Sequence, residues 1–161
     1  MRLKAFQDYY PDNYAHCYGC GHLNEHGLKI KSYWDGDESV CQFSPRSYHT
    51  GGFPDYLYGG LIASLIDCHA AGTAAAAKAR EEGIDPEVQP LERFVTASIK
   101  VDYLTPTPVD TIELRAKVRE INGRKVWVDV TVSSGDKVRA KGEADDPGSG
   151  PDPELKSLSI R

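Results

Sequence analysis

A single carboxylate follows a pair of glycines at a spacing of about two helical turns. Gly59 and Gly60 open a long segment of helix-forming residues, and Asp67 comes eight residues after Gly59. The first amides of a helix have no partner within it, and the helix dipole favours negative charge there. An N–H of Gly59 or Gly60 would therefore polarise a carbonyl and stabilise the oxyanion that forms from it. The structural alternative is that the glycines only allow the helix to pack closely against a strand.

Asp67 lies on a helix face that is otherwise made of small residues. A carboxylate in such a setting is costly to bury unless it is paired or used in a reaction. It would act as a general base for an attacking water, or as a nucleophile that forms an anhydride. Both roles stay open at this stage, and so does a purely structural ion pair with a neighbour.

Helical periodicity from Gly60 to Glu82 predicts one long central helix, and Gly83 is a suitable stop. The apolar face that we expect to be buried consists of Leu61, Ile62, Leu65, Ile66, His69, Thr73 and Ala77. The opposite face, which suits a partner subunit, carries Ser64, Asp67, Ala71, Ala74 and Ala75. A helix that is small or apolar all round is either buried all round or covered by a partner.

Alternating apolar and polar residues predict antiparallel strands on both sides of this helix. The expected strands lie at 28–34, 39–43, 95–103, 112–119, 126–132 and 138–144. Within the third, the residues expected to face the core are Val95, Ala97, Ile99, Val101 and Tyr103. Strands grouped around one helix indicate an α+β fold in a single domain over residues 1–145, with an irregular segment at 1–27. Residues 146–161 are rich in Asp, Pro, Gly and Ser, so we expect a flexible tail there.

The charge pattern and hydropathy argue against two classes of partner. The net charge is −5 and the basic residues are interspersed with acidic ones, whereas a nucleic-acid binder needs a clustered basic surface. No apolar run approaches the ~20 residues that span a bilayer, so no membrane partner is expected. The first residues lack the apolar core of a signal peptide, which favours a cytoplasmic protein.

Four cysteines are too few for a disulfide scaffold. Cys17 and Cys20 form one Cys-x-x-Cys pair with histidines nearby, but a structural zinc site takes four ligands, usually as two pairs. Cys41 and Cys68 fall in a strand and a helix pattern far along the chain. We therefore expect buried thiols in a glycine turn, no metal site and no cofactor.

Three motifs in this order resemble the PaaI-like branch of the hotdog-fold acyl-CoA thioesterase superfamily. The first is Cys-Tyr-Gly-Cys-Gly at 17–21, followed by Gly-Leu before the first strand. The second is Phe-Pro-Asp-Tyr-Leu-Tyr-Gly-Gly at 53–60 with Asp67 at the expected distance. The third is Thr-Ala-Ser-Ile-Lys-Val-Asp-Tyr at 96–103, followed by a Pro-x-Pro turn. One position departs from the family, because Tyr58 stands where the family has a histidine.

The resemblance implies a hotdog fold, in which an antiparallel sheet of about five to six strands wraps around one long central helix. It implies a thioesterase that hydrolyses an acyl-CoA with Gly59 as oxyanion hole and Asp67 as general base or nucleophile. Thr96 would come from the partner subunit and position the water or Asp67, with Ser98 as a weaker substitute. The site would then lie between subunits, in a homodimer or in a homotetramer built as a dimer of dimers.

The residues expected to line the substrate pocket are Tyr58, Gly60, His49 and Ser98. For His49, a solvated position in the loop is the structural alternative. Tyr58 also keeps open a non-catalytic protein that binds acyl-CoA or another small ligand, because a tyrosine does not become a cation near neutral pH. A hotdog hydratase or dehydratase would carry a paired acidic residue and histidine in one loop, and no such pair is present. A zinc-stabilised interaction module is the remaining alternative.

Overall fold

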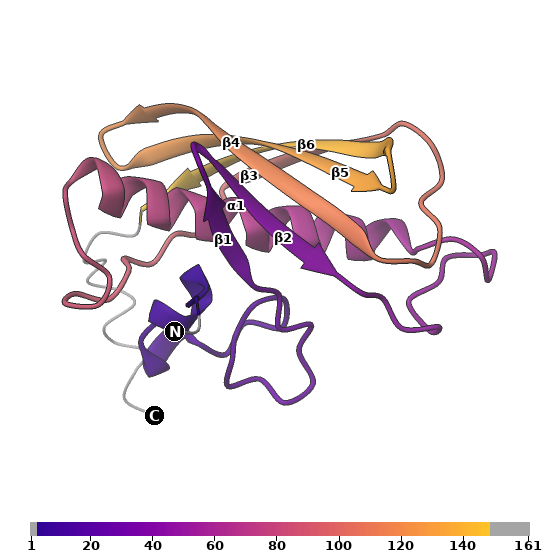
Figure 1. Cartoon of the computed structure of the whole chain (residues 1–161), viewed down its shortest axis with the longest axis horizontal. Coiled ribbons are helices and arrows are strands. Elements are labelled where there is room, and N and C mark those ends of the chain that lie inside the picture. The colour runs from indigo at the N-terminus through magenta and orange to yellow at the C-terminus, as the bar shows by residue number, and fades with distance from the viewer. Residues whose placement is uncertain (1–2, 149–161) are drawn as a thin grey trace.

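One long helix packs against a single antiparallel sheet in the computed structural model, which describes residues 3–148 (Figure 1). The elements in chain order are η1 (Phe6–Tyr9), η2 (Asp12–Tyr14), β1 (Ser32–Asp35), β2 (Glu38–Phe43), α1 (Gly59–Glu81), β3 (Ser98–Tyr103), β4 (Ile112–Asn122), β5 (Lys125–Ser134) and β6 (Lys137–Pro147). The six strands lie in the order β1-β2-β4-β5-β6-β3, and every neighbouring pair is antiparallel. The predicted α+β architecture is therefore confirmed.

Helix α1 is the central element of the core. All seven residues of its predicted apolar face are buried, and it ends just before Gly83, whose φ of 68° is the left-handed conformation typical of a helix stop. By length and hydropathy alone, α1 could cross a bilayer. The sequence analysis had found no apolar run long enough for this. However, 72% of that apolar window is buried inside the protein, as in the core helix of a globular domain.

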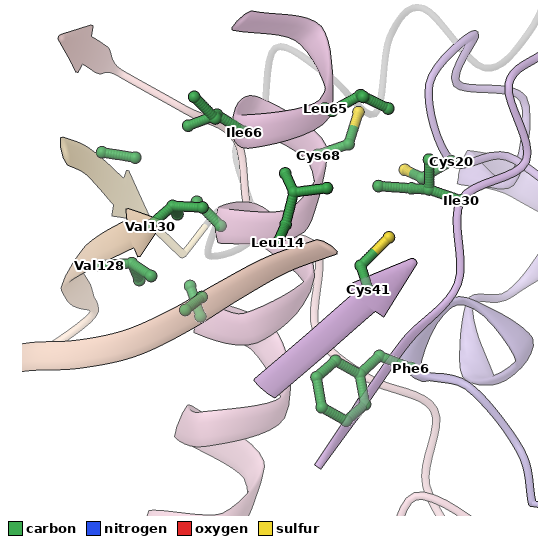
Figure 2. Packing of buried hydrophobic residues seen from close by; sticks show 14 of the residues in the cluster. Phe6, Cys20, Ile30, Cys41, Leu65, Ile66, Cys68, Leu114, Val128 and Val130 are labelled. Atoms are coloured by element: carbon green, nitrogen blue, oxygen red, sulfur yellow. The ribbon is translucent and has the colours of Figure 1, made fainter. Parts of the chain in front are cut away.

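The core lies between α1 and the inner face of the sheet. The alternating valines of β5 point inward from the middle of the sheet, and Figure 2 shows Leu114, Val128 and Val130 lying over the same part of α1 as Ile66. These side chains are at most 2% exposed. The two-residue alternation of β5 and the helical period of α1 therefore bury the residues that they predict to be buried.

Helix α1 packs closely against the sheet at a glycine of β6. A Cβ built on Gly142 would lie 2.5 Å from Cγ2 of Ile66 and 3.2 Å from its Cδ1. Gly142→Ala should therefore lower the free energy of unfolding by about 1–3 kcal/mol, because the added methyl forces helix and strand apart. Urea unfolding checks this, with Gly52→Ala as the matched control.

Gly52 has no heavy atom within 4 Å of its Cβ position, so Gly52→Ala should leave stability within about 0.5 kcal/mol of wild type. Equal midpoints for both variants would contradict close packing at Gly142.

Strand β3 does not behave as predicted. Its apolar residues were expected to face the core, but Val95, Ile99 and Tyr103 are 38%, 39% and 53% exposed, and Ala97 is also exposed. The reason is its position, because β3 is an edge strand bonded only to β6. Val101 is partly buried against the core, whereas Ile99 and Tyr103 of this strand stay exposed within residues 3–148.

The C-terminal boundary was also predicted too early. β6 runs to Pro147 and pairs with β5 through Asp146 and Pro147, two residues beyond the expected end of the domain at 145. Gly148 still forms a bridge to Phe94. The rest of the predicted tail, 149–161, lies outside the described residues.

Buried polar side chains form a hydrogen-bonded chain beside the core, and their contacts determine which atom donates in each bond. Thr73 Oγ1 donates to the His69 carbonyl, so it accepts from Ser39 Oγ at 2.6 Å. Ser39 Oγ then accepts from His69 Nε2 at 3.3 Å, which leaves His69 Nδ1 to accept from Ser32 Oγ at 2.9 Å. Ser32 Oγ in turn accepts from Gln7 Nε2. His69 is therefore neutral with its proton on Nε2, and burial lowers its pKa to about 4.

Candidate functional site

A cavity of about 340 Å³ lies between the first half of α1 and the chain that leads into β3. Its walls include Asp67, Thr96 and Ser98, so three of the residues singled out in the sequence converge on one hollow. The rest of the lining is small or aliphatic: Ala63, Ser64, Ala97 and Ile99.

Asp67 is partly exposed on α1. Within residues 3–148 its carboxylate makes no hydrogen bond and no ion pair, so the structural ion pair considered for it is not formed there. The nearby Ser64 hydroxyl donates instead to the carbonyl of Gly60 at 2.8 Å. A carboxylate left without a protein partner beside a cavity is available to a water or a substrate.

The small face of α1 is shorter than the sequence suggested. Ala63, Ser64, Asp67 and Ala71 are partly exposed, but Ala74 and Ala75 are 0% and 2% exposed within the single chain. These two alanines are therefore not free to meet a partner subunit.

Thr96 lies just before β3, and its hydroxyl donates to Oδ1 of Asp146 at 2.8 Å. The resemblance assigned a water or Asp67 to the Thr96 hydroxyl of a partner subunit. Thr96 of the same chain lines the cavity of Asp67, and within residues 3–148 it forms no hydrogen bond to Asp67. Its oxygen keeps lone pairs that can accept a hydrogen bond from a water.

Asp146 is a buried second carboxylate that the sequence analysis missed by assigning it to the tail. It is 0% exposed, and its Oδ2 has no hydrogen-bond partner among residues 3–148. Burial raises its pKa to about 7, the Thr96 hydrogen bond opposes that shift, and the charges of Asp67 and Asp145 add to it. The signal was present in the sequence, because the alternation of inward-facing residues 140, 142 and 144 continues to 146.

The start of α1 forms a second group of predicted residues. The N–H groups of Leu61 and Ile62 both donate to the carbonyl of Tyr58, at 3.1 and 3.3 Å. Within residues 3–148 the amides of Gly59 and Gly60 donate to no backbone carbonyl, as an oxyanion hole requires. The ring of Tyr58 lies over Gly60 so closely that a Cβ on Gly60 would clash with it.

His49 and Tyr103 complete this group. The His49 carbonyl accepts the N–H of Tyr58 at 3.0 Å, and its Nδ1 accepts the N–H of Arg46 at 2.9 Å. Burial and the Arg46 charge lower the pKa of His49. Tyr103, which the sequence analysis had not placed at the site, donates its hydroxyl to the Gly59 carbonyl at 2.6 Å.

The two groups are separate within one chain. Neither Gly59 nor Gly60 lines the cavity of Asp67. Eight residues of helix rise about 12 Å, so Gly59 and Asp67 of one chain are too far apart to act on the same carbonyl.

A cluster of three thiols lies on the other side of Asp67. The sulfur atoms of Cys17, Cys20 and Cys68 are all within 4.8 Å of one another, and Cys17 Sγ and Cys68 Sγ are 3.7 Å apart. Figure 2 shows Cys68 on α1 and Cys20 on the N-terminal segment, while Cys41 lies apart on β2. The expectation of no metal rested on treating Cys68 as remote from the Cys-x-x-Cys pair, and in space it is their neighbour.

The three thiols affect one another's pKa values. Hydrogen bonds from Cys20 and Cys68 lower the pKa of Cys17. The pKa of Cys20 is raised by its hydrogen bond with Cys17 and by burial, and its hydrogen bond with Cys68 opposes that shift. The pKa of Cys68 is raised by its hydrogen bonds with Cys17 and Cys20 and by burial.

The sequence profile of the Thioesterase superfamily matches residues 55–141, which include α1, β3, β4, β5 and part of β6. The crystal structure of a Thioesterase superfamily protein from Shewanella loihica PV-4 is 37% identical, covers 88% of this chain and 100% of its own, and superposes with a TM-score of 0.65. The PaaI protein from the phenylacetic acid degradation operon of E. coli is 18% identical over 76% of this chain and 81% of its own, with a TM-score of 0.62, which shows the fold alone.

Among curated proteins, the chain is similar to acyl-coenzyme A thioesterase THEM4 from Rattus norvegicus, with 32% identity over 98 residues. The match covers 60% of this chain and 36% of that protein, so the chain spans about a third of the length of this curated relative. Because the superfamily profile covers residues 55–141 of 161 and the Shewanella structure is matched over its whole length, the chain belongs to the thioesterase superfamily and has its hotdog fold.

Proposed function

We propose that this protein hydrolyses an acyl-CoA thioester to a free acid and coenzyme A. The observation that carries the proposal is the carboxylate of Asp67, which makes no hydrogen bond or ion pair within residues 3–148 and lies at a cavity that Thr96 and Ser98 also line. Membership of the thioesterase superfamily supports thioester chemistry, and the name of the rat relative supports coenzyme A as the thiol.

The chemistry assigned to Asp67 takes one of two forms. As a general base, it accepts a proton from water while the hydroxide attacks the thioester carbon. The C–S bond then breaks, the acid leaves, and the coenzyme A thiolate takes up the proton. As a nucleophile, its own oxygen attacks, coenzyme A leaves, and water hydrolyses the resulting anhydride. Thr96, which donates to Asp146 and can accept from water, is proposed to orient that water.

The oxyanion hole is proposed to come from a second subunit. About 12 Å of helix separates Gly59 from Asp67, whereas reacting atoms need to approach within about 3–3.5 Å. A homodimer that brings the start of one α1 to the Asp67 cavity of the other would satisfy both requirements. Two surfaces support such a partner subunit: the exposed apolar residues of edge strand β3, and the partly exposed part of the small face of α1, from Ala63 to Ala71.

Tyr58 supports a second candidate, a non-catalytic protein that binds acyl-CoA. Its ring lies over Gly60 at the helix start, where an anion would have to approach. The ring is 58% exposed, however, so it has room to move aside when a ligand arrives. Hydrolysis remains the first candidate because binding alone does not require a carboxylate at the cavity that, in the described part of the chain, has no hydrogen bond or ion pair.

The test is turnover of a panel of short, long and aromatic acyl-CoAs by the purified protein, followed through release of the free thiol. We expect turnover of at least one acyl-CoA well above the rate in buffer. Saturable binding of acyl-CoA without thiol release would overturn the hydrolase and favour the binding protein.

A further inference from the structure

We propose that Cys17, Cys20 and Cys68 form a zinc site in which three thiolates hold the ion and a fourth position opens to the neighbouring cavity. The site is distinct from the proposed oxyanion hole, and it does not depend on the thioesterase activity. It rests on two segments far apart in the sequence: the 17–20 turn and the middle of α1.

The turn that carries Cys17 and Cys20 is built rigidly. The N–H of Gly21 donates to the Cys17 carbonyl at 2.8 Å, and two further backbone bonds hold the turn from outside, from Leu28 to Tyr18 at 2.7 Å and from Ile30 to Gly19 at 3.2 Å. The turn therefore presents its two sulfurs in a fixed arrangement, as metal ligands require.

Glycines allow this turn to approach the helix. A Cβ on Gly19 would collide with Sγ of Cys68, and a Cβ on Gly21 would collide with the backbone of Ala15 and Cys17. Any other residue at position 19 would push Cys68 away from the pair. The absence of a side chain at Gly19 therefore lets the third thiol approach the pair, and Gly21 allows the turn to close on its own backbone.

The spacing of the sulfurs suits zinc. Two sulfurs that each lie about 2.3 Å from one zinc ion at the tetrahedral angle are about 3.8 Å apart. The Cys17–Cys68 separation is 3.7 Å, and Cys20 needs only a small adjustment from its position within 4.8 Å of both. A disulfide would require a separation of about 2.05 Å and would use only two of the three thiols.

The environment also suits a coordination site with an open position. The three cysteines line a cavity of about 430 Å³, and His16 and Asp67 lie on the same wall. Cys20 and Cys68 are 8% and 7% exposed, and Cys17 is exposed on the cavity side, so the ion would enter past Cys17. Three protein ligands and an open fourth position are typical of zinc sites that also bind water or a ligand.

The test is zinc stoichiometry and affinity in the full chain. Protein stripped with a chelator under reducing conditions is titrated with Zn²⁺ against a chromophoric competitor, and Co²⁺ is used as a second probe because thiolate–cobalt coordination gives an intense near-ultraviolet band. We expect close to one Zn²⁺ per chain and a thiolate band with Co²⁺. Cys17→Ser, at an exposed position, should weaken Zn²⁺ binding about 100-fold or more.

Cys41→Ala is the matched control, because Cys41 is buried on β2 and outside the cluster. It should bind Zn²⁺ as the wild type does, and circular dichroism verifies that each variant is folded. Three results would each overturn the site. The first is substoichiometric zinc, and the second is equal affinity for zinc in Cys17→Ser and wild type. The third is a chain that forms a Cys17–Cys20 or Cys17–Cys68 disulfide and takes up no metal once it is reduced. Failure here leaves acyl-CoA turnover as measured, so it is separate from failure of the proposed hydrolase.

Discussion

Asp67→Asn is expected to lower kcat for acyl-CoA hydrolysis by about 10²–10⁴-fold while leaving the fold intact. Asparagine has nearly the same shape, but it neither accepts a proton from water nor forms an anhydride. Asp67 makes no hydrogen bond or ion pair within residues 3–148, so the substitution breaks no contact that stabilises the fold. KM should change much less than kcat, because the lost interaction belongs to the transition state.

Asp136→Asn is the matched control, since Asp136 is an exposed carboxylate in the turn between β5 and β6. It should retain wild-type kcat. If Asp67→Asn kept full activity, Asp67 would be neither base nor nucleophile.

A single-turnover reaction in water enriched in ¹⁸O tests for the nucleophilic form in which water hydrolyses the anhydride at the Asp67 carbonyl. If water attacks the anhydride at the carbonyl carbon of Asp67, a labelled oxygen stays on Asp67, and mass spectrometry of the peptide detects it. A general base would leave Asp67 unlabelled.

His69→Ala is expected to destabilise the protein by about 3 kcal/mol or more at neutral pH. His69 is 0% exposed and connects Ser32 to Ser39. Truncation opens a cavity and leaves both buried hydroxyls short of a partner. His26→Ala, at an exposed position, should stay within about 0.5 kcal/mol of wild type. Urea unfolding at about pH 7.5 measures both.

The stability difference between wild type and His69→Ala should narrow in acid. The pKa of His69 falls from 6.5 when unfolded to about 4 when folded, so below pH 6.5 the unfolded chain takes up the proton first. The contribution of neutral His69 to the free energy of unfolding is therefore fully present above pH 6.5. It is lost as the pH falls toward 4, by about 3 kcal/mol in total.

The contribution of Asp146 to stability changes with pH in the opposite direction, over a similar pH range. Its pKa rises from 3.8 to about 7 on folding, so it favours the folded state as the pH falls. Both proteins contain Asp146, and the wild-type minus His69→Ala difference therefore isolates His69. A difference that stayed constant between about pH 7.5 and 4.5 would mean that His69 is not buried in its neutral form.

The chain pattern alone was sufficient for one long helix and six strands. The alternation of β5, the apolar face of α1 and the stop at Gly83 depend on interactions between residues close in sequence, so a linear pattern contains them. The resemblance carried by residues 17–21, 53–67 and 96–108 was sufficient for the family.

Tertiary structure decided which groups meet. The register of β6 against β5 buries Asp146 and brings its carboxylate to Thr96, although the composition around Asp146 had indicated a tail. The alternation of β3 predicted that its apolar side chains would be buried, but most of them stay exposed because β3 lies at the sheet edge. The packing of the 17–20 turn on α1 brings Cys68 to a pair of thiols that lie about 50 residues earlier in the chain. Each outcome depends on the relative placement of distant segments, and periodicity within one segment contains no information about that placement.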